Sequence, residues 1–191
     1  MQSGLGRDGV SLNSASNHDS ALEGVLPFPE VGVSSWGVAW TKSKCEKALV
    51  EYLQSKSVAH FLPLVSKRRS YGSRIRRSWL PLFPGYVFFD TSAIDRSGVF
   101  ASRRVADVLY PDDEPQLRAD LQNLSIALQQ DDSLREARYG EIGTIVSIKG
   151  GALKGLSGEL VRYGSQSRLI VRIHFLGKAA ELEIDEGFID A

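Results

Sequence analysis

The alternation of apolar and polar residues predicts two regions of different texture. Over residues 34–131, short apolar runs with a period of two alternate with stripes that recur every three or four residues, as in strands interleaved with helices. Over residues 140–191 the apolar runs are all short, rich in Val and Ile, and separated by Gly or Ser. The pattern predicts an α+β chain: an α/β sandwich, a polar linker at residues 132–139, and a small β-barrel. Residues 1–33, which are Ser- and Gly-rich without a period, predict a disordered tail.

The first region predicts five strands and two helices. Ser43 and Glu46 have the spacing of a capping box, so the first helix should begin there. Asp113 is expected to cap the second helix, which carries a leucine stripe. The predicted strands span residues 35–40, 58–65, 75–80, 86–89 and 105–110. The apolar stripes are Cys45, Ala48, Leu49, Tyr52 and Leu53 in the first helix, and Leu117, Leu121, Leu124 and Leu128 in the second.

The stretch LPLFPGYVFFD, residues 80–90, organises the first region. Its Pro-Gly pair predicts a turn, and the turn feeds a strand of aromatic and β-branched residues. Alternation sends Tyr86 and Phe88 to one face of this strand, and Val87 and Phe89 to the other. Because both faces carry large apolar groups, the strand is either packed on both sides within the chain or presents one face to a partner.

Charge is unevenly distributed, although the 191 residues include 23 Lys and Arg against 23 Asp and Glu. Residues 62–89 contain no acidic residue, and basic residues concentrate at 66–77, where Tyr71-Gly72-Ser73 predicts a hairpin tip. Such clustering is typical of a phosphate contact, and a solvated hairpin is the alternative. The clustered cations are Lys67, Arg68, Arg69, Arg74, Arg76 and Arg77 in the hairpin, Lys42, Lys44 and Lys47 near the first helix, and Arg103 and Arg104 before the fifth strand.

Residue types for catalysis are sparse. The three histidines, His18, His60 and His174, lack metal-ligand spacing, and no glycine-rich phosphate loop precedes a helix. The single cysteine, Cys45, excludes an internal disulfide. No apolar run approaches the ~20 residues of a membrane span, and the N-terminus lacks the features of a secretory signal. We therefore expect a cytoplasmic protein that is not an enzyme and needs no cofactor or metal.

Motifs in both regions resemble one family. WGVAWTKSKCEK, FLPLV and LFPGYVFF resemble the N-terminal domain of the NusG-like transcription factors, which include the RfaH-type paralogues. IVSIKGGALKGLSGELV and RLIVRIHFLGKAAELEI resemble a KOW module, which is an SH3-like barrel. Together these motifs cover about residues 34–190. The resemblance implies a transcription elongation or antitermination factor that binds RNA polymerase, promotes processivity and suppresses pausing or termination.

The resemblance also implies a site for each partner. An apolar hollow would receive the clamp helices of the polymerase β′ subunit, and basic residues would face upstream DNA or the non-template strand, although the hairpin could equally touch polymerase. The KOW module would recruit Rho or the ribosomal protein that acts as NusE, and a monomer without a membrane partner is expected. The implied polymerase-binding residues are Val38, Trp40, Tyr86, Phe88 and Tyr110; the nucleic-acid-binding residues are Lys42, Lys44, Arg68, Arg69, Arg74, Arg103 and Arg104; and the KOW turn residues are Gly151, Lys154, Gly155 and Gly158.

Two departures from the family pattern favour a specialised paralogue. Residues 95–98, Asp-Arg-Ser-Gly, stand where RfaH-type proteins carry a Thr-rich motif that meets the β-subunit gate loop, and Arg104 adds a second basic residue after Arg103. The strand alternation of residues 169–175 opposes the helical hairpin that RfaH forms. The alternative function is that of a KOW-type RNA-binding or ribosome-associated protein, and the near-neutral charge of residues 140–191 argues against it.

Overall fold

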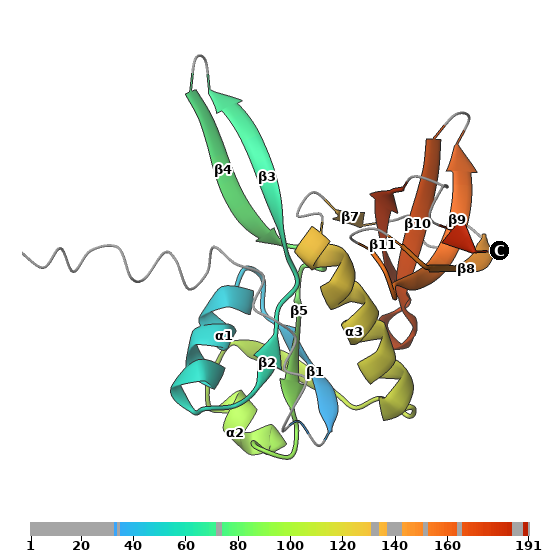
Figure 1. The fold of residues 1–191 in the computed structure, drawn as a ribbon. Helices are drawn as coiled ribbons and strands as arrows, with labels where there is room; N and C mark the ends of the chain where they lie inside the picture. The colour runs from blue at the N-terminus through green and yellow to red at the C-terminus, as the bar shows by residue number, and fades with distance from the viewer. Residues whose placement is uncertain are drawn as a thin grey trace, which may run out of the picture.

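The computed structural model places two antiparallel sheets on opposite sides of one long helix, α3, Glu114–Gln130 (Figure 1). A two-stranded ribbon projects away from the first sheet. Among the described residues, no helix is long and apolar enough to cross a membrane. The structure describes residues 33, 35–71, 74–130, 134–136, 143–150, 153–163, 166–184 and 189–190.

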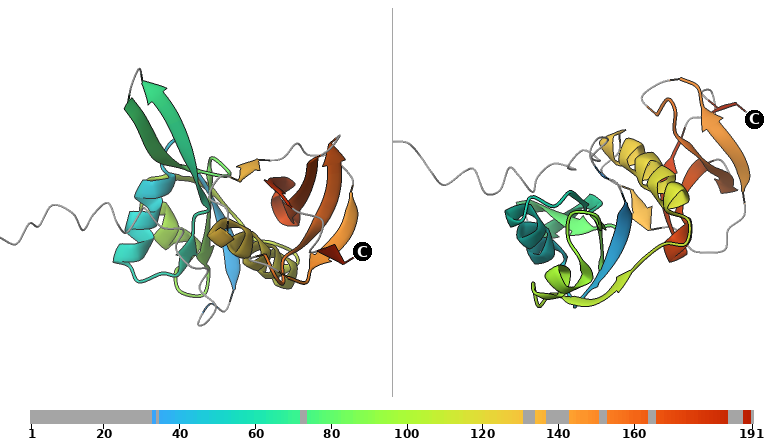
Figure 2. Two further views of the ribbon diagram at one scale, coloured as in Figure 1. Left: turned by 45° about the horizontal axis from the view of Figure 1, so that its top comes forward. Right: turned by 90° about the horizontal axis from the view of Figure 1, so that it is seen from below.

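The N-terminal sheet has four strands in the order β2-β5-β1-β6. Helices α1 and α2 lie on one side of this sheet, and α3 lies on the other (Figure 2). The strands are β1, Trp36–Thr41, β2, His60–Phe61, β5, Tyr86–Asp90, and β6, Val105–Leu109; the helices are α1, Glu46–Ser55, and α2, Arg96–Phe100.

Both faces of β5 are covered. Val87 and Phe89 pack into an apolar cluster with α1, whereas Phe88 packs into a second cluster with the leucines of α3. All three side chains have 0% exposure. The apolar stripe of α3 is confirmed, because each of its four leucines is buried. The interior of β5 is therefore a strand packed on both sides within the chain, and only Tyr86 at its start is half-buried.

The ribbon consists of β3, Leu64–Tyr71, and β4, Arg74–Pro81. Its register runs from the pair of Leu64 with Pro81 to the pair of Tyr71 with Arg74, so the tip falls at residues 72–73, which lie outside the described residues. The single strand predicted at residues 58–65 is wrong. The chain leaves β2 after Phe61 and enters β3 only at Leu64, because Pro63 has no N–H to continue a strand ladder.

The C-terminal sheet has six strands in the order β12-β8-β9-β10-β11-β7. Within the described residues, no pairing joins β12 to β7, so the sheet does not close into the predicted barrel. Residues from the predicted linker contribute to this sheet, since β7 pairs with β11 and Leu134 is buried. The elements are β7, Arg135–Glu136, β8, Thr144–Ile148, β9, Ser157–Tyr163, β10, Gln166–Ile173, the 3-10 helix η1, His174–Leu176, β11, Lys178–Glu183, and β12, Ile189–Asp190.

One of the two predicted helix caps is present and the other is not. Asp113 caps α3 as expected, because its Oδ1 accepts a hydrogen bond of 3.0 Å from the N–H of Gln116. The predicted capping box at Ser43 and Glu46 is wrong: Cys45 is the N-cap of α1 and makes no side-chain capping bond. The missed helix α2 is capped by Asp95, whose Oδ1 accepts a 2.7 Å hydrogen bond from the N–H of Gly98.

Candidate functional site

The open part of the N-terminal sheet carries two aromatic side chains from adjacent strands. The register places Trp40 of β1 opposite Tyr86 of β5, so both side chains project from the same face of the sheet. Trp40 is 50% exposed and Tyr86 is half-buried. We call these two residues the aromatic pair. They form an apolar surface at the end of the sheet that α3 leaves uncovered.

The turn before β5 fixes the position of the aromatic pair. Gly85 has a φ of +90°, which glycine adopts without strain, and a side chain there would also contact the indole of Trp40. The N–H of Gly85 donates a 2.7 Å hydrogen bond to the buried carboxylate of Glu46, and its carbonyl accepts one of 2.8 Å from the N–H of Thr41. Glu46 thus anchors this turn to α1, which is why it does not complete the capping box.

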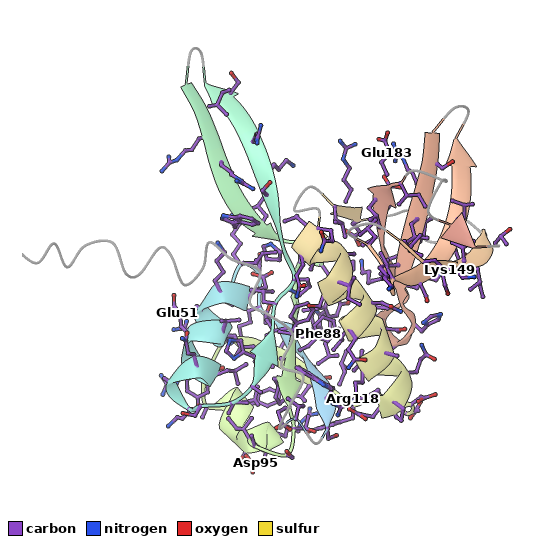
Figure 3. All side chains as sticks on the ribbon, in the orientation of Figure 1. Glu51, Phe88, Asp95, Arg118, Lys149 and Glu183 are labelled. Atoms are coloured by element: carbon purple, nitrogen blue, oxygen red, sulfur yellow. The ribbon has the colours of Figure 1, made fainter. Side chains whose placement is uncertain are left out.

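Two of the predicted polymerase-binding residues lie beneath α3. Val38 and Phe88 are register partners on the same sheet face as the aromatic pair, but each has 0% exposure. Figure 3 shows Phe88 in the interior, between the N-terminal sheet and α3. The expectation that these two side chains line an open hollow is therefore not met, because the leucine stripe of α3 covers them.

Tyr110 is exposed but does not join the aromatic pair. It is 51% exposed and follows the last residue of β6. The partner of Trp40 on β6 is Asp107. Tyr110 therefore lies three residues further along the chain, which corresponds to ~10 Å of strand. The structure separates this predicted site residue from Trp40 and Tyr86.

Three of the predicted nucleic-acid-binding residues meet at one corner, beside Trp40. The Nζ of Lys42 donates a 3.0 Å hydrogen bond to the carbonyl of Arg103, and the backbone N–H of Lys42 donates one of 2.8 Å to the carbonyl of Arg104. Lys42 and Arg103 are exposed, and the Nε of Arg104 is buried without a hydrogen-bond partner in the described part of the chain. We call Lys42, Arg103 and Arg104 the basic corner.

A groove of about 1130 Å³ lies at the base of the ribbon. The predicted residues Lys44 and Arg68 line it, together with Lys47, Lys67 and Trp79. Trp79 was not among the residues predicted from the sequence, although its position two residues after Arg77 in a strand pattern places both on one face. In the structure, the guanidinium carbon of Arg77 lies 4.8 Å from the centre of the Trp79 ring.

The remaining ribbon residues are placed by backbone pairing. Arg68 lies opposite Arg77, and Arg69 lies opposite Arg76. Arg68, Arg76 and Arg77 are exposed, whereas the side chains of Arg69 and Arg74 lie outside the described residues.

Comparison with known proteins identifies the region that holds these surfaces. Residues 34–117 match the family model described as transcription termination factor nusG. This range contains the aromatic pair, the basic corner and the whole ribbon. These residues, which make up fewer than half of the chain, are NusG-like. No curated protein matches the chain. Among solved structures, a Thermotoga maritima NusG structure, described as "Domain interaction in Thermotoga maritima NusG", is similar to this chain. The sequence identity is 19%, the match covers 82% of this chain and 96% of that one, and the TM-score is 0.46.

In the C-terminal part of the chain, two of the predicted turn residues have the expected turn features and a third lies in a strand. Lys154 is exposed and Gly155 has a φ of +89°, as expected of a tight turn. Gly158 lies inside β9 rather than in a turn, where a side chain would come within 2.6 Å of the carbonyl oxygen of Ile170. Its role is to allow close approach of β10. Gly151 lies outside the described residues.

Polar contacts join the C-terminal sheet to α3. The carboxylate of Asp120, which is buried, accepts hydrogen bonds from the backbone N–H of His174 at 2.8 Å and from the side-chain amide of Gln116 at 2.7 Å. Ile173 is buried, and Phe175 and Leu176 pack against the cluster that includes α3. Within the described residues, no group of three or more His, Cys, Asp or Glu could hold a metal ion.

Proposed function

We propose that this NusG-like chain is a transcription elongation factor that docks on the clamp helices of the RNA polymerase β′ subunit. The observation that carries the proposal is the aromatic pair, which lies open at the end of a NusG-type sheet and is held by the Gly85 turn. Aromatic side chains on a rigid support are typical anchors of protein interfaces, because they bury much area at little cost in conformational entropy.

The basic corner supports a nucleic-acid contact beside the polymerase contact. Lys42 and Arg103 are joined by a hydrogen bond, and both are exposed. Lys42 lies two residues after Trp40 in the chain. Docking of the aromatic pair would bring these cations to the DNA that polymerase holds, either upstream duplex or non-template strand. Their phosphate contacts would weaken as salt concentration rises.

This arrangement works by binding and needs no catalytic group. A protein that contacts both polymerase and its DNA stabilises the closed, processive complex and thereby suppresses pausing or termination. The C-terminal sheet would act as a KOW module, presenting the turn at Lys154 and Gly155 to Rho or to the ribosomal protein that acts as NusE. That recruitment would couple the elongating complex to termination or translation.

The test is binding to RNA polymerase that holds an assembled transcription bubble. We expect Trp40→Ala combined with Tyr86→Ala to weaken binding by at least about 30-fold, since the loss of even one hot-spot aromatic costs about 2 kcal/mol or more. Ile145→Ala is the matched control, because Ile145 is a 79% exposed apolar residue on the C-terminal sheet. The affinity of Tyr110→Ala for polymerase tests whether the polymerase contact extends along β6.

Circular dichroism must show that the double variant retains the wild-type fold. Equal affinity of the double variant and the Ile145→Ala control would refute docking through the aromatic pair.

A further inference from the structure

The groove at the base of the ribbon is lined by five cations, which are Lys44, Lys47, Lys67, Arg68 and Arg135. Among the residues that the structure describes, no carboxylate forms an ion pair with any of these five. Their charge is therefore balanced by solvent ions or by an anionic group from outside the chain.

The two carboxylates in the groove wall are bonded elsewhere in the fold. The buried carboxylate of Glu46 accepts a 2.7 Å hydrogen bond from the N–H of Gly85. The carboxylate of Glu136 accepts a hydrogen bond, also of 2.7 Å, from the Nζ of Lys178. With five cations against two carboxylates, the groove attracts negative charge.

Apolar side chains form the rest of the groove wall. Leu80, which is 38% exposed, and the half-buried Trp79 come from β4, and the half-buried Val65 comes from β3. A purely ionic ligand would leave these side chains in contact with water. The groove therefore fits a ligand that combines negative charge with apolar groups.

The size of the groove favours a polypeptide segment over a small molecule. Its volume of about 1130 Å³ exceeds the ~300–1,000 Å³ that is typical of small-molecule pockets. Its wall includes residues of α1, of the ribbon and of β7, which lies beside the base of the ribbon (Figure 1). A ligand that fills the groove contacts all three.

The lining of the groove also favours a peptide over a nucleic acid. Single-stranded nucleic acids bind through aromatic side chains on which successive bases stack. Among the described residues that line the groove, only Trp79 is aromatic, and the guanidinium carbon of Arg77 lies 4.8 Å from the centre of its ring. The aliphatic side chains of the groove match the Leu and Val side chains of a protein instead.

Strand edges at the groove offer backbone hydrogen bonds. In the described part of the chain, β7 is the outermost strand of the C-terminal sheet, and β3 and β4 pair only with each other. An extended peptide can add to an open strand edge through main-chain hydrogen bonds, with its alternate side chains placed in pockets.

We propose that the groove binds an acidic peptide segment of a partner protein, in which Asp or Glu alternates with aliphatic residues. Its carboxylates pair with Lys47, Lys67 and the other lining cations, and its aliphatic side chains pack on Leu80 and Trp79. None of the residues of the aromatic pair or of the basic corner lines the groove. The inference therefore goes beyond the proposed function and adds a second interaction surface.

The experiment measures fluorescence anisotropy of a labelled 12-residue peptide of alternating Glu and Leu with the full chain in 50 mM KCl. Lys47→Gln combined with Lys67→Gln should weaken binding about fivefold, since each exposed ion pair contributes a factor of roughly 1.5 to 5. Lys56→Gln combined with Lys149→Gln is the matched control, because it removes the same charge from exposed positions outside the groove. The control should bind the peptide as the wild type does.

Two further variants test whether the peptide lies in the groove. Binding should change the tryptophan emission of the wild type, and Trp79→Phe should abolish that change while most of the affinity remains. Leu80→Ser keeps every charge and should weaken binding a few-fold. Circular dichroism must show that each variant retains the wild-type fold.

Two further probes test the class of ligand. The same peptide with Gln in place of Glu should bind at least about fivefold more weakly, and unlabelled 12-nucleotide single-stranded DNA should compete less well than the unlabelled acidic peptide. Tighter binding of the DNA, equal affinity for the Gln peptide, equal affinity of the groove and control variants, or no wild-type binding at 50 mM KCl would each overturn the proposal. The assay contains no polymerase, so its outcome does not depend on docking through the aromatic pair.

Discussion

Arginine side chains of the C-terminal sheet and of the ribbon face different charges on their neighbouring strands. In the C-terminal sheet, Arg172 of β10 bonds the carboxylate of Glu159 on β9, and Arg168 bonds Glu181 on β11. In the ribbon, Arg68 faces Arg77. A cation with a carboxylate on the neighbouring strand stabilises its own sheet, whereas a cation opposite a cation costs stability. The difference separates arginines that bond a carboxylate on the neighbouring strand from arginines that face a like charge there.

The same comparison bears on the alternative function, an RNA-binding or ribosome-associated protein that uses its C-terminal region. Three cations of the C-terminal sheet, Arg168, Arg172 and Lys178, are already bonded to carboxylates. Those cations would have to leave their partners before they could bind phosphate. The unbalanced positive charge lies in the NusG-type domain, which supports the transcription factor as the proposed function.

The largest expected effect comes from breaking a pair in the C-terminal sheet. Arg172→Met would leave Glu159, whose side chain is only 20% exposed, without its bonded cation. Glu159 would keep only the 3.1 Å hydrogen bond from the Gly143 N–H, and leaving a charged group partly unsatisfied costs about 1–3 kcal/mol, so the free energy of unfolding should fall by about that amount. Arg76→Met in the ribbon should change it by less than about 0.5 kcal/mol. Urea denaturation of both variants measures the free energy of unfolding. Equal losses in the two variants would contradict the difference between the C-terminal sheet and the ribbon.

A smaller effect on the free energy of unfolding should appear when pH is varied. The hydrogen bond from Arg172 is the main cause that holds the pKa of Glu159 below its ordinary value of 4.5. A carboxyl whose pKa is lowered by folding contributes stability that is complete above 4.5 and is lost as pH falls below it, through the lowered value. The gap in unfolding free energy between the wild type and Arg172→Met should therefore narrow below pH 4.5. A gap that stays constant down to pH 3 would contradict this, and Arg76→Met should show no such trend.

The smallest expected effect comes from giving the ribbon an arginine–carboxylate pair like those of the C-terminal sheet. Arg68→Glu replaces a like-charge pair by an opposite-charge pair with Arg77, which should raise stability by about 0.2–1 kcal/mol at low salt. The gain should shrink at 1 M salt, where charges are screened beyond about 3 Å. Arg68→Glu combined with Ser70→Lys would keep more of the ribbon's charge, and Ser70→Glu alone is the positional control, since it places a carboxylate on the same face but opposite Ile75 instead of a cation. Thermal melts at both salt concentrations measure the difference, and an equal gain in the control would show that the pairing with Arg77 is not responsible.

Local patterns predicted the elements well. The leucine stripe of α3, the strand at residues 86–89 and the hairpin centred on Gly72 each depend on neighbours in sequence, and the structure places α3, β5 and the ribbon there. Even so, local rules failed where a distant group intervened. Glu46 has the spacing of a capping residue, but the N–H of Gly85 takes its carboxylate.

The candidate site was less predictable, because it depends on long-range packing. The family resemblance grouped Val38, Phe88 and Trp40 in one hollow, but which of them stays exposed depends on where the coverage by α3 ends. The separation of Tyr110 from Trp40 follows from the register of β6 with β1. Neither relation leaves a signal in residue spacing. The open C-terminal sheet was missed for the same reason, since barrel closure is a property of strand pairing.

The position of α3 has a consequence for how the chain unfolds. Its side chains belong to an apolar cluster that extends from Trp36 in the N-terminal sheet to Ile173 in the C-terminal sheet. Neither sheet can lose its structure without exposing part of this shared helix, including the buried carboxylate of Asp120. The two sheets therefore form one cooperative unit, and heating should melt them together in a single transition although the sequence divides them into two regions.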